Sequence, residues 1–315
     1  MKSRTITTDL EIYNQKSSNH NIPFNNMILR SKFSLFLLAV CAALQACSSV
    51  GLGVINTKEK INKKHQSLQN IVYGEKTWQK LDVYTPVSNQ TNLKPVIVFF
   101  YGGSWDSGRK EQYLFAASAF TQLGYVVVIP DYVKFPQGKF PQFIHDGAAS
   151  IAWVKKHISE HGGNPDQVFI VGHSAGAHLG ALLVTDAEYL SKHDLKPTDV
   201  SAFAGLAGPY NFTPKAPKIV RIFEPEENYP KMKIMNHLNG DEPPMLFAHG
   251  LKDTTVSVRN QQANIKVIQQ IGGTYKEIVY PEASHVSILL RLSSFYRGGK
   301  KPSEDIHNFF RSVSN

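Results

Sequence analysis

Residues 168–176 read Val-Phe-Ile-Val-Gly-His-Ser-Ala-Gly, and this stretch decides which fold we expect for the 315-residue chain. The apolar run at its start is typical of a strand that is buried on both faces, and the Ala- and Leu-rich segment 175–185 is typical of a helix. Between them, Gly172 and Gly176 allow the backbone to turn sharply and to hold a serine side chain above the sheet. We therefore predict that Ser174 is a nucleophile at a strand-to-helix turn.

On both sides of this turn, strand-like apolar runs alternate with helix-like patterns. The expected strands are 78–84, 95–100, 125–129, 168–171, 200–206, 245–249 and 275–279. The expected helices are 112–123, 143–161, 175–185, 256–271 and 303–312. This alternation predicts an α/β fold with a mostly parallel twisted sheet and helices on both faces. Residues 209–243 break the alternation with many prolines, and we expect a long loop or small cap beside the site there.

A nucleophilic serine needs hydrogen-bond donors for the oxyanion that forms when it attacks a carbonyl group. The expected strand 95–100 is followed at once by Tyr-Gly-Gly-Ser-Trp105, and consecutive glycines let backbone N–H groups approach a ligand oxygen. We predict that the N–H groups of Gly103 and Ser104, together with that of Ala175, form an oxyanion hole. Taken alone, the glycine pair is equally consistent with a plain turn.

The serine also needs a base, and the base needs an acid that orients it. Asp253 and His285 each follow an expected strand and lie in the chain order Ser, Asp, His, which is the order that accompanies a serine turn of this kind. We predict that His285 takes the proton of Ser174 and that Asp253 holds the imidazole ring in the required tautomer.

Other polar residues near these positions leave alternatives open. His249 is a second candidate for the base, and Glu282 is a second candidate for the acid. His173 and His178 flank the nucleophile without room for an orienting acid, so we expect them to support the turn. Asp131 follows an expected strand and is expected to brace the loop below the oxyanion turn.

Five aromatic residues on expected loops are candidates to rim a substrate pocket: Trp105, Phe135, Tyr210, Phe212 and Phe223. Their bulk favours small or aromatic acyl groups over long chains. Anchoring of the loops is the alternative role for the same side chains.

Composition and charge exclude several classes of protein. Hydrophobic residues make up 42% of the chain and charged residues 19%, which is typical of a globular protein and not of a disordered one. The formal net charge is +9, but the basic residues are isolated or in short pairs, so we predict no nucleic-acid partner. No His or Cys spacing fits a metal site and no glycine-rich phosphate loop is present, so we predict no metal and no cofactor.

The N-terminal segment has the pattern of an export signal. Basic residues precede the apolar stretch 33–44, which is shorter than the roughly 20 residues of a membrane-spanning helix. Leu-Gln-Ala-Cys47 then resembles the lipobox of bacterial lipoproteins, which implies cleavage before Cys47 and a diacylglycerol on its sulfur. A plain secretory signal and an uncut N-terminal anchor are the alternatives.

This pattern also sets the expected organisation of the chain. We expect an N-terminal extension with a lipoprotein signal peptide over 1–46, a tether over 47–70 and a catalytic domain over 71–315. An early helix within 48–70 is the alternative to a tether. By resemblance to lipoproteins, the protein is exported and anchored by lipid to a bacterial membrane. Ser48 after the modified cysteine favours the outer membrane, on its periplasmic side.

Three motifs followed by two single residues carry a family resemblance: Tyr101-Gly-Gly-Ser-Trp105, Pro130-Asp-Tyr132, Gly172-His-Ser-Ala-Gly176, Asp253 and His285. They resemble the alpha/beta-hydrolase superfamily over residues 71–313, and within it the carboxylesterase group that includes hormone-sensitive-lipase-like, isoprenylcysteine methyl-, feruloyl and acetylxylan esterases and kynurenine formamidases. Those relatives usually carry histidine where this chain has Tyr101. The resemblance implies a serine hydrolase that forms an acyl-enzyme on small-molecule esters. An amidase, formamidase or peptidase with the same residues, and a non-catalytic lipoprotein of the same fold, are the alternatives.

Overall fold

The computed structural model describes residues 52, 53, 55–57, 59, 65–87 and 92–314. All of them belong to one compact unit, Val50–Asn315. The predicted signal peptide and Cys47 lie outside the described residues, so both stay predictions. Within the described part of the chain, no helix has the length and apolar character needed to span a membrane.

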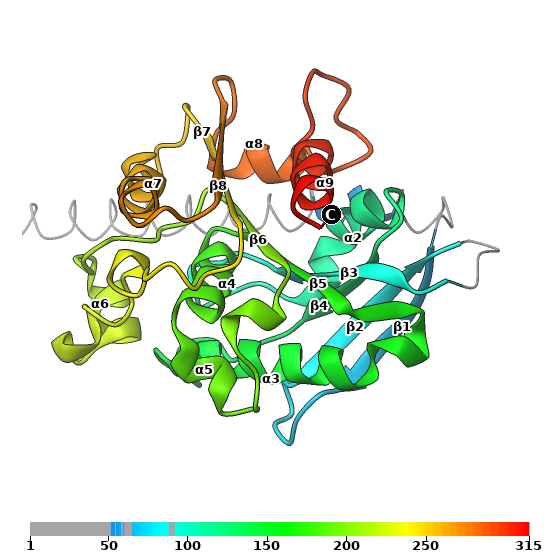
Figure 1. Ribbon diagram of the computed structural model, residues 1–315, viewed down its shortest axis with the longest axis horizontal. Helices are drawn as coiled ribbons and strands as arrows, with labels where there is room; N and C mark the ends of the chain where they lie inside the picture. Colours follow the sequence, from blue (N-terminus) through cyan, green and yellow to red (C-terminus); the bar gives the residue numbers. More distant parts are fainter. Residues whose placement is uncertain (1–51, 54, 58, 60–64, 88–91, 315) are drawn as a thin grey trace, which may run out of the picture. The chain divides into compact units, whose positions relative to one another are not determined.

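An eight-stranded sheet forms the centre of this unit (Figure 1). Its strands are β1 (His65–Val72), β2 (Lys80–Pro86), β3 (Lys94–Phe100), β4 (Val126–Pro130), β5 (Gly163–His173), β6 (Ala202–Leu206), β7 (Met245–Gly250) and β8 (Tyr275–Tyr280). They lie in the order β1-β2-β4-β3-β5-β6-β7-β8. The strands from β4 to β8 in this order are parallel, whereas β2 pairs antiparallel with both β1 and β4. The predicted mostly parallel sheet is therefore confirmed.

Helices cover both faces of the sheet, as the alternating pattern predicts. They are α2 (Leu114–Thr121), α3 (Gln142–His157), α4 (Ala175–Thr185), α5 (Ala187–Ser191), α6 (Pro217–Phe223), α7 (Arg259–Ile271), α8 (His285–Leu290) and α9 (Pro302–Val313). Figure 1 shows α3 and α4 on one side of the sheet and α2 and α9 on the other. The expected strands and helices are all present, with their ends shifted by a few residues.

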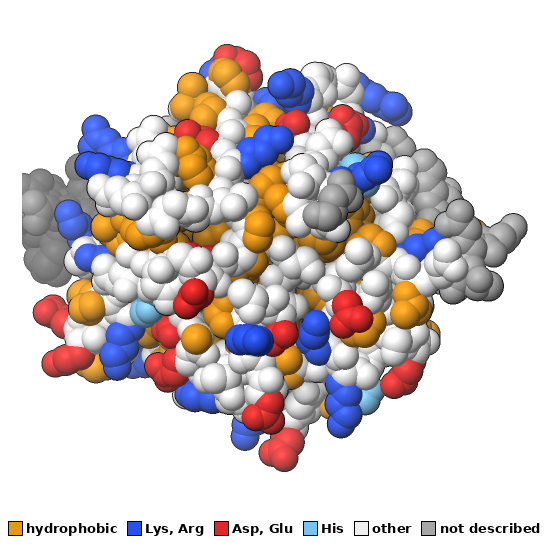
Figure 2. Space-filling view, in the orientation of Figure 1, with side chains coloured by type: hydrophobic (Ala, Val, Ile, Leu, Met, Phe, Trp, Pro, Cys, Tyr) orange, Lys and Arg blue, Asp and Glu red, His pale blue; other side chains and the backbone are white. Residues whose placement is uncertain are grey.

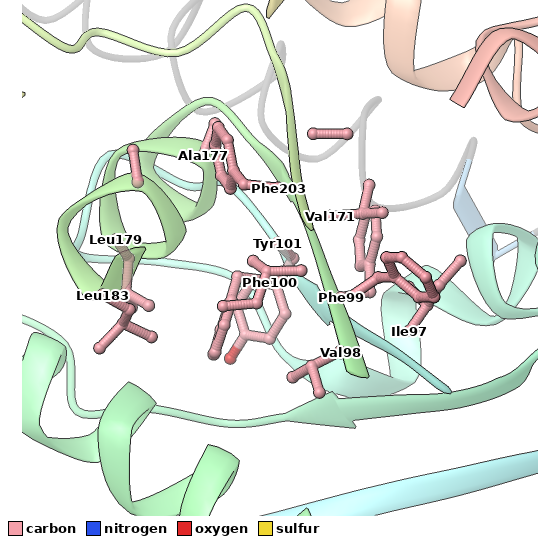
Figure 3. Packing of buried hydrophobic residues seen from close by; sticks show 14 of the residues in the cluster. Ile97, Val98, Phe99, Phe100, Tyr101, Val171, Ala177, Leu179, Leu183 and Phe203 are labelled. Atoms are coloured by element: carbon pink, nitrogen blue, oxygen red, sulfur yellow. The ribbon is translucent and has the colours of Figure 1, made fainter. Parts of the chain in front are cut away.

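The central strand β3 explains why its apolar run is continuous. Successive side chains of a strand point to opposite faces, and both faces of β3 are covered. Figure 3 shows Ile97 and Phe99 on one side of the sheet, whereas Phe100 lies on the other side, facing Leu179 and Leu183 of α4. All five side chains are fully buried, and this packing fixes where the end of β3 meets the start of α4.

The predicted boundary between tether and catalytic domain, at residue 71, is wrong. Strand β1 (His65–Val72) falls almost wholly in the predicted tether 47–70 and pairs antiparallel with β2 at the edge of the sheet. Most of its side chains are exposed, so the strand shows none of the alternation of apolar and polar residues by which a half-buried strand is found in a sequence.

Two residues further upstream also belong to the folded unit. Asn56 donates a hydrogen bond to the carbonyl of Glu111 (3.0 Å) and accepts one from the N–H of Phe115 (3.1 Å). The carboxylate of Glu59 accepts a hydrogen bond from Ser118 (2.6 Å). Both side chains are buried, so this part of the predicted tether packs against the start of α2.

Residues 209–243 hold one regular helix, α6, between irregular segments and short 3₁₀ turns. The prediction of a long loop or small cap is correct in outline. Phe223, however, lies at the end of α6 and not on a loop.

Candidate active site

Ser174 occupies a strained turn between β5 and α4. Its φ of 52° and ψ of −121° lie outside the backbone regions that residues other than glycine prefer. A Cβ atom on Gly172 would lie 2.5 Å from the carbonyl oxygen of Gly176, and one on Gly176 would overlap the carbonyl oxygen of Phe100. Glycine is therefore required at both positions, because the first turn of α4 lies against Gly172 and the end of β3 lies against Gly176.

One line of hydrogen bonds joins the three residues that the sequence predicts to act together. Nε2 of His285 lies 2.8 Å from the hydroxyl oxygen of Ser174, and Nδ1 of His285 lies 2.8 Å from a carboxylate oxygen of Asp253. In the neutral imidazole with a proton on Nδ1, the ring donates to Asp253 and accepts from the serine hydroxyl. This is the arrangement that a base needs in order to take the serine proton.

Both carboxylate oxygens of Asp253 accept hydrogen bonds. Its second carboxylate oxygen accepts hydrogen bonds from the N–H groups of Thr255 and Val256, both 2.8 Å long. The side chain of Asp253 is fully buried and that of His285 is 13% exposed. Because little water screens the pair, the carboxylate interacts strongly with any positive charge that forms on the ring.

His173 hydrogen-bonds to the backbone of His285. Its Nε2–H donates to the carbonyl oxygen of His285 (2.9 Å), and the two rings lie 5.0 Å apart. Burial, with a further contribution from His285, lowers the pKa of His173 to about 3. The ring is therefore neutral near pH 7, and it adds a hydrogen bond without a competing charge.

His249 contacts the acid and not the serine. Its Nε2–H donates to the carbonyl of Val256 (2.8 Å) and lies 3.3 Å from Asp253. Burial lowers its pKa. The structure thus places His249 where it can hold the Asp253 turn and not where the alternative prediction of a base requires it.

The alternative acid Glu282 also lies apart from the line of hydrogen bonds, and so does His178, which the sequence predicts to support the turn. The side chain of Glu282 is 72% exposed and pairs with Lys252. His178 is fully buried in α4, and its Nε2–H donates to the carbonyl of Met232 (2.8 Å). It therefore fastens the helix behind Ser174 to the segment 209–243.

The turn after β3 has an unusual backbone. Gly103, Ser104 and Trp105 all have positive φ, at 129°, 51° and 59°. A Cβ atom on Gly103 would overlap the carbonyl of Ser107. Within the described residues, no acceptor pairs with the N–H groups of Gly103, Ser104 or Ala175, so all three donors are unpaired.

Tyr101 braces the turn that follows β3. Its hydroxyl donates to the carboxylate of Asp131, which also accepts from the N–H of Lys110 (3.1 Å). The ring is stacked between those of Tyr113 (4.9 Å) and Tyr132 (5.0 Å). Burial raises the pKa of Tyr101 well above its usual value, so the phenol stays protonated and keeps donating.

A cavity of about 320 Å³ opens beside Ser174. Trp105 and Phe212 form one apolar wall, with their rings stacked 5.6 Å apart. The full lining is Ser104, Trp105, Ser174, Pro209, Phe212, Thr213, Pro214, Lys215, Ile219, Thr255, Val256, Ser257 and Asn260. The sequence motifs and the expected rim aromatics single out only four of these, Ser104, Trp105, Ser174 and Phe212. The remainder come from the proline-rich segment 209–243 and from the turn and helix that follow Asp253.

Three of the five predicted rim aromatics do not line this cavity. Tyr210 is 1% exposed and packs edge-on against Phe247, and Phe223 is fully buried against Trp105. Phe135 lies under the guanidinium group of Arg221. These three aromatics anchor the loops, which is the role that the sequence left open as an alternative.

Two further features of the described residues concern metal binding and surface charge. No group of three or more His, Cys, Asp or Glu side chains in that part of the chain is arranged to hold a metal ion. On the face shown in Figure 2, Lys and Arg side chains are interspersed with Asp and Glu side chains. This face therefore offers no extended patch of positive charge.

Several proteins that are named as esterases are similar in sequence to this chain. The family described as BD-FAE matches residues 81–266. The isoprenylcysteine alpha-carbonyl methylesterase ICME of Arabidopsis thaliana is 29% identical over 257 residues, which are 75% of this chain and 60% of that protein. The probable carboxylic ester hydrolase LipM of Mycobacterium tuberculosis is 30% identical over 234 residues, which are 68% of this chain and 54% of that protein. The chain thus spans little more than half the length of these relatives.

Solved structures of esterases share the fold. An inhibited esterase B from Lactobacillus rhamnosis superposes with a TM-score of 0.70 at 19% identity, and the match covers 88% of this chain and 97% of that one. A truncated carbohydrate esterase from gut microbiota superposes with a TM-score of 0.68 at 20% identity, over 79% of this chain and 96% of that one. The predicted alpha/beta-hydrolase fold is therefore confirmed.

Proposed function

The chain belongs to the BD-FAE family, and from this premise we propose that it is a serine esterase that hydrolyses carboxylic esters. The observation that carries the proposal is the unbroken line of hydrogen bonds from Asp253 through His285 to Ser174, each 2.8 Å long. The names of its relatives support the same reaction, since they include a methylesterase and a probable carboxylic ester hydrolase.

In the first half of the reaction, the hydroxyl oxygen of Ser174 attacks the ester carbonyl while Nε2 of His285 takes its proton. The carbonyl oxygen becomes an oxyanion, and the N–H groups of Gly103, Ser104 and Ala175 donate hydrogen bonds to it. The C–O bond to the alcohol then breaks, and His285 returns the proton to the leaving oxygen. The products of this half are a free alcohol and an acylated serine.

In the second half, a water molecule takes the place of the alcohol. His285 removes one of its protons, the hydroxide attacks the acyl-enzyme, and the proton returns to Ser174 as the acid leaves. Asp253 stabilises the imidazolium that forms in each half and fixes which ring nitrogen faces the serine. Its two backbone donors, at Thr255 and Val256, keep the carboxylate in place through both halves.

The cavity favours small or aromatic acyl groups. Its volume of about 320 Å³ lies at the lower end of the roughly 300–1,000 Å³ of ligand pockets. Trp105 and Phe212 add a flat apolar wall. We expect p-nitrophenyl acetate and butyrate to be hydrolysed faster than long-chain esters, and a preference for long chains would contradict this assignment of substrate size.

Turnover of p-nitrophenyl butyrate by the wild type and by Ser174→Ala tests the proposed function. We expect hydrolysis by the wild type and a fall in kcat of at least about 10⁴-fold in the variant. The matched p-nitroanilide distinguishes an esterase from an amidase. Faster cleavage of the anilide than of the ester would favour an amidase, and an inactive wild type would contradict the proposal.

We also propose that the protein is exported and attached to a bacterial membrane through a lipid on Cys47. The support is the sequence around this residue, Leu-Gln-Ala-Cys-Ser-Ser. Metabolic labelling with palmitate should mark the wild type and not Cys47→Ser. Labelling that persists in the variant would exclude this anchor.

A further inference from the structure

One charged side chain lines the cavity beside Ser174. Of its lining residues, all within the described part of the chain, Lys215 alone carries a formal charge, and none is acidic. A cation without a counter-ion attracts an anionic group of a ligand, and because Lys215 is exposed the expected strength is that of a solvated ion pair.

The cations next to Lys215 are already engaged. Lys218 forms an ion pair with Asp106 (2.5 Å), and the guanidinium of Arg221 lies 5.0 Å from the centre of the Phe135 ring. No ion pair or side-chain hydrogen bond of the described residues involves the ammonium group of Lys215. Its charge is therefore left for a ligand.

The backbone that carries Lys215 is restricted. Pro214 and Pro217 fix φ at their own positions, and Ala216, which precedes a proline, has the extended conformation that this position favours, with φ −68° and ψ 136°. Because the segment loses little conformational entropy when a ligand binds, more of the ionic attraction is available for binding.

The cavity lining holds both polar and apolar residues, and an anionic ester has parts that suit each. Exposed hydroxyl groups at Thr213, Thr255 and Ser257 lie on the cavity lining together with Lys215, and they can donate hydrogen bonds to a carboxylate. Trp105 and Phe212 supply apolar surface for the carbon chain between that carboxylate and the ester.

From these observations we propose that the preferred substrates are esters that carry a carboxylate on the acyl or the alcohol part, with Lys215 binding that carboxylate. This inference rests on the proposed esterase function. It names a substrate class, the monoesters of dicarboxylic acids and the acyl esters of hydroxy acids, and it makes Lys215 the residue that selects for this class.

Two matched substrate pairs test the proposal. The first is the p-nitrophenyl half-ester of adipic acid against the p-nitrophenyl ester of its monoamide, and the second is 4-acetoxybutyrate against its amide. Each pair differs only in one charge. We expect the wild type to prefer the charged member of at least one pair by about 5-fold in kcat/KM, as for an exposed ion pair of about 1 kcal/mol, and high salt should reduce the preference.

Three variants complete the test. The charged-to-neutral ratio should fall to about 1 in Lys215→Ala, stay near the wild-type value in Lys215→Arg, and stay unchanged in Lys276→Ala, which removes an exposed lysine of β8 outside the cavity. A wild type without preference, or a preference that survives Lys215→Ala, would overturn this inference alone. A wild type that cleaves neither member of either pair, nor p-nitrophenyl butyrate, would instead overturn the proposed function.

Discussion

The Ser174 turn and the segment 209–219 border the same cavity, but they are built in opposite ways. The turn is buried and lies between two glycines where any side chain would collide with backbone. The segment is rich in proline, its residues range from buried to exposed, and six of them line the cavity. The comparison teaches that close packing fixes the position of Ser174, whereas the segment 209–219 lines the cavity under fewer packing constraints.

The largest effect is expected at the acid that orients the base. In Asp253→Asn an amide N–H can donate to Nδ1 of His285, whereas the carboxylate accepts from it. This favours the tautomer with the proton on Nε2, which cannot take the proton of Ser174. We expect kcat for p-nitrophenyl butyrate to fall about 10⁴-fold. Glu282→Gln, at an exposed carboxylate outside the line of hydrogen bonds, should retain wild-type kcat, and equal losses in the two variants would contradict the assignment.

The packing of the turn is tested next, by Gly176→Ala. The new methyl group would overlap the carbonyl oxygen of Phe100, and because that atom belongs to a central strand it cannot move away cheaply. We expect the free energy of unfolding to fall by about 3 kcal/mol or more. Gly272→Ala, where nothing lies within 4 Å of the new atom and φ is 76°, should cost only about 1 kcal/mol, and similar losses at both sites would argue against a tightly packed turn.

An effect that appears only at acidic pH is expected at His178, which ties α4 to the segment 209–243. Burial lowers the pKa of His178 to about 4 from its ordinary value of 6.5. Between these values the unfolded chain binds a proton and the folded protein does not, so the free energy of unfolding falls as the pH falls from 6.5 to 4, by about 1.4 kcal/mol per pH unit. Urea unfolding across this range should show a shallower slope in His178→Gln and the wild-type slope in His193→Gln, an exposed control.

The smallest effect is expected at Phe212, in the segment 209–219. Phe212→Ala removes half of the stacked aromatic wall but none of the reacting groups. We expect KM for p-nitrophenyl butyrate to rise about 5-fold with little change in kcat. Tyr229→Ala, a half-buried aromatic outside the cavity lining, should leave KM unchanged, and a loss of kcat in Phe212→Ala would mean that this wall positions the reacting atoms as well.

The same contrast explains what the sequence could predict. Ser174, Asp253 and His285 follow the ends of strands, and the ends of parallel strands meet at one edge of a sheet, so the motif and the strand pattern together are enough to expect them in one place. Tyr101 and Asp131 follow the neighbouring strands β3 and β4, which is also why a brace below the oxyanion turn could be anticipated.

What the sequence did not predict lies where side-chain direction is set by tertiary packing. Tyr210 and Phe223 turn into the core, whereas Phe212, between them in the chain, turns to the cavity, and no periodicity in a proline-rich segment distinguishes these directions. The sequence does not predict strand β1 either, because an exposed edge strand buries too few side chains to show an apolar pattern.

The central claim is that Ser174 is an activated nucleophile, and labelling by a fluorophosphonate probe tests it most directly. The probe reacts with a serine whose proton is taken by a base, so the folded wild type should be labelled once, at Ser174. Ser174→Ala and the heat-denatured wild type should remain unlabelled. An unlabelled wild type, or equal labelling of Ser174→Ala, would contradict the claim.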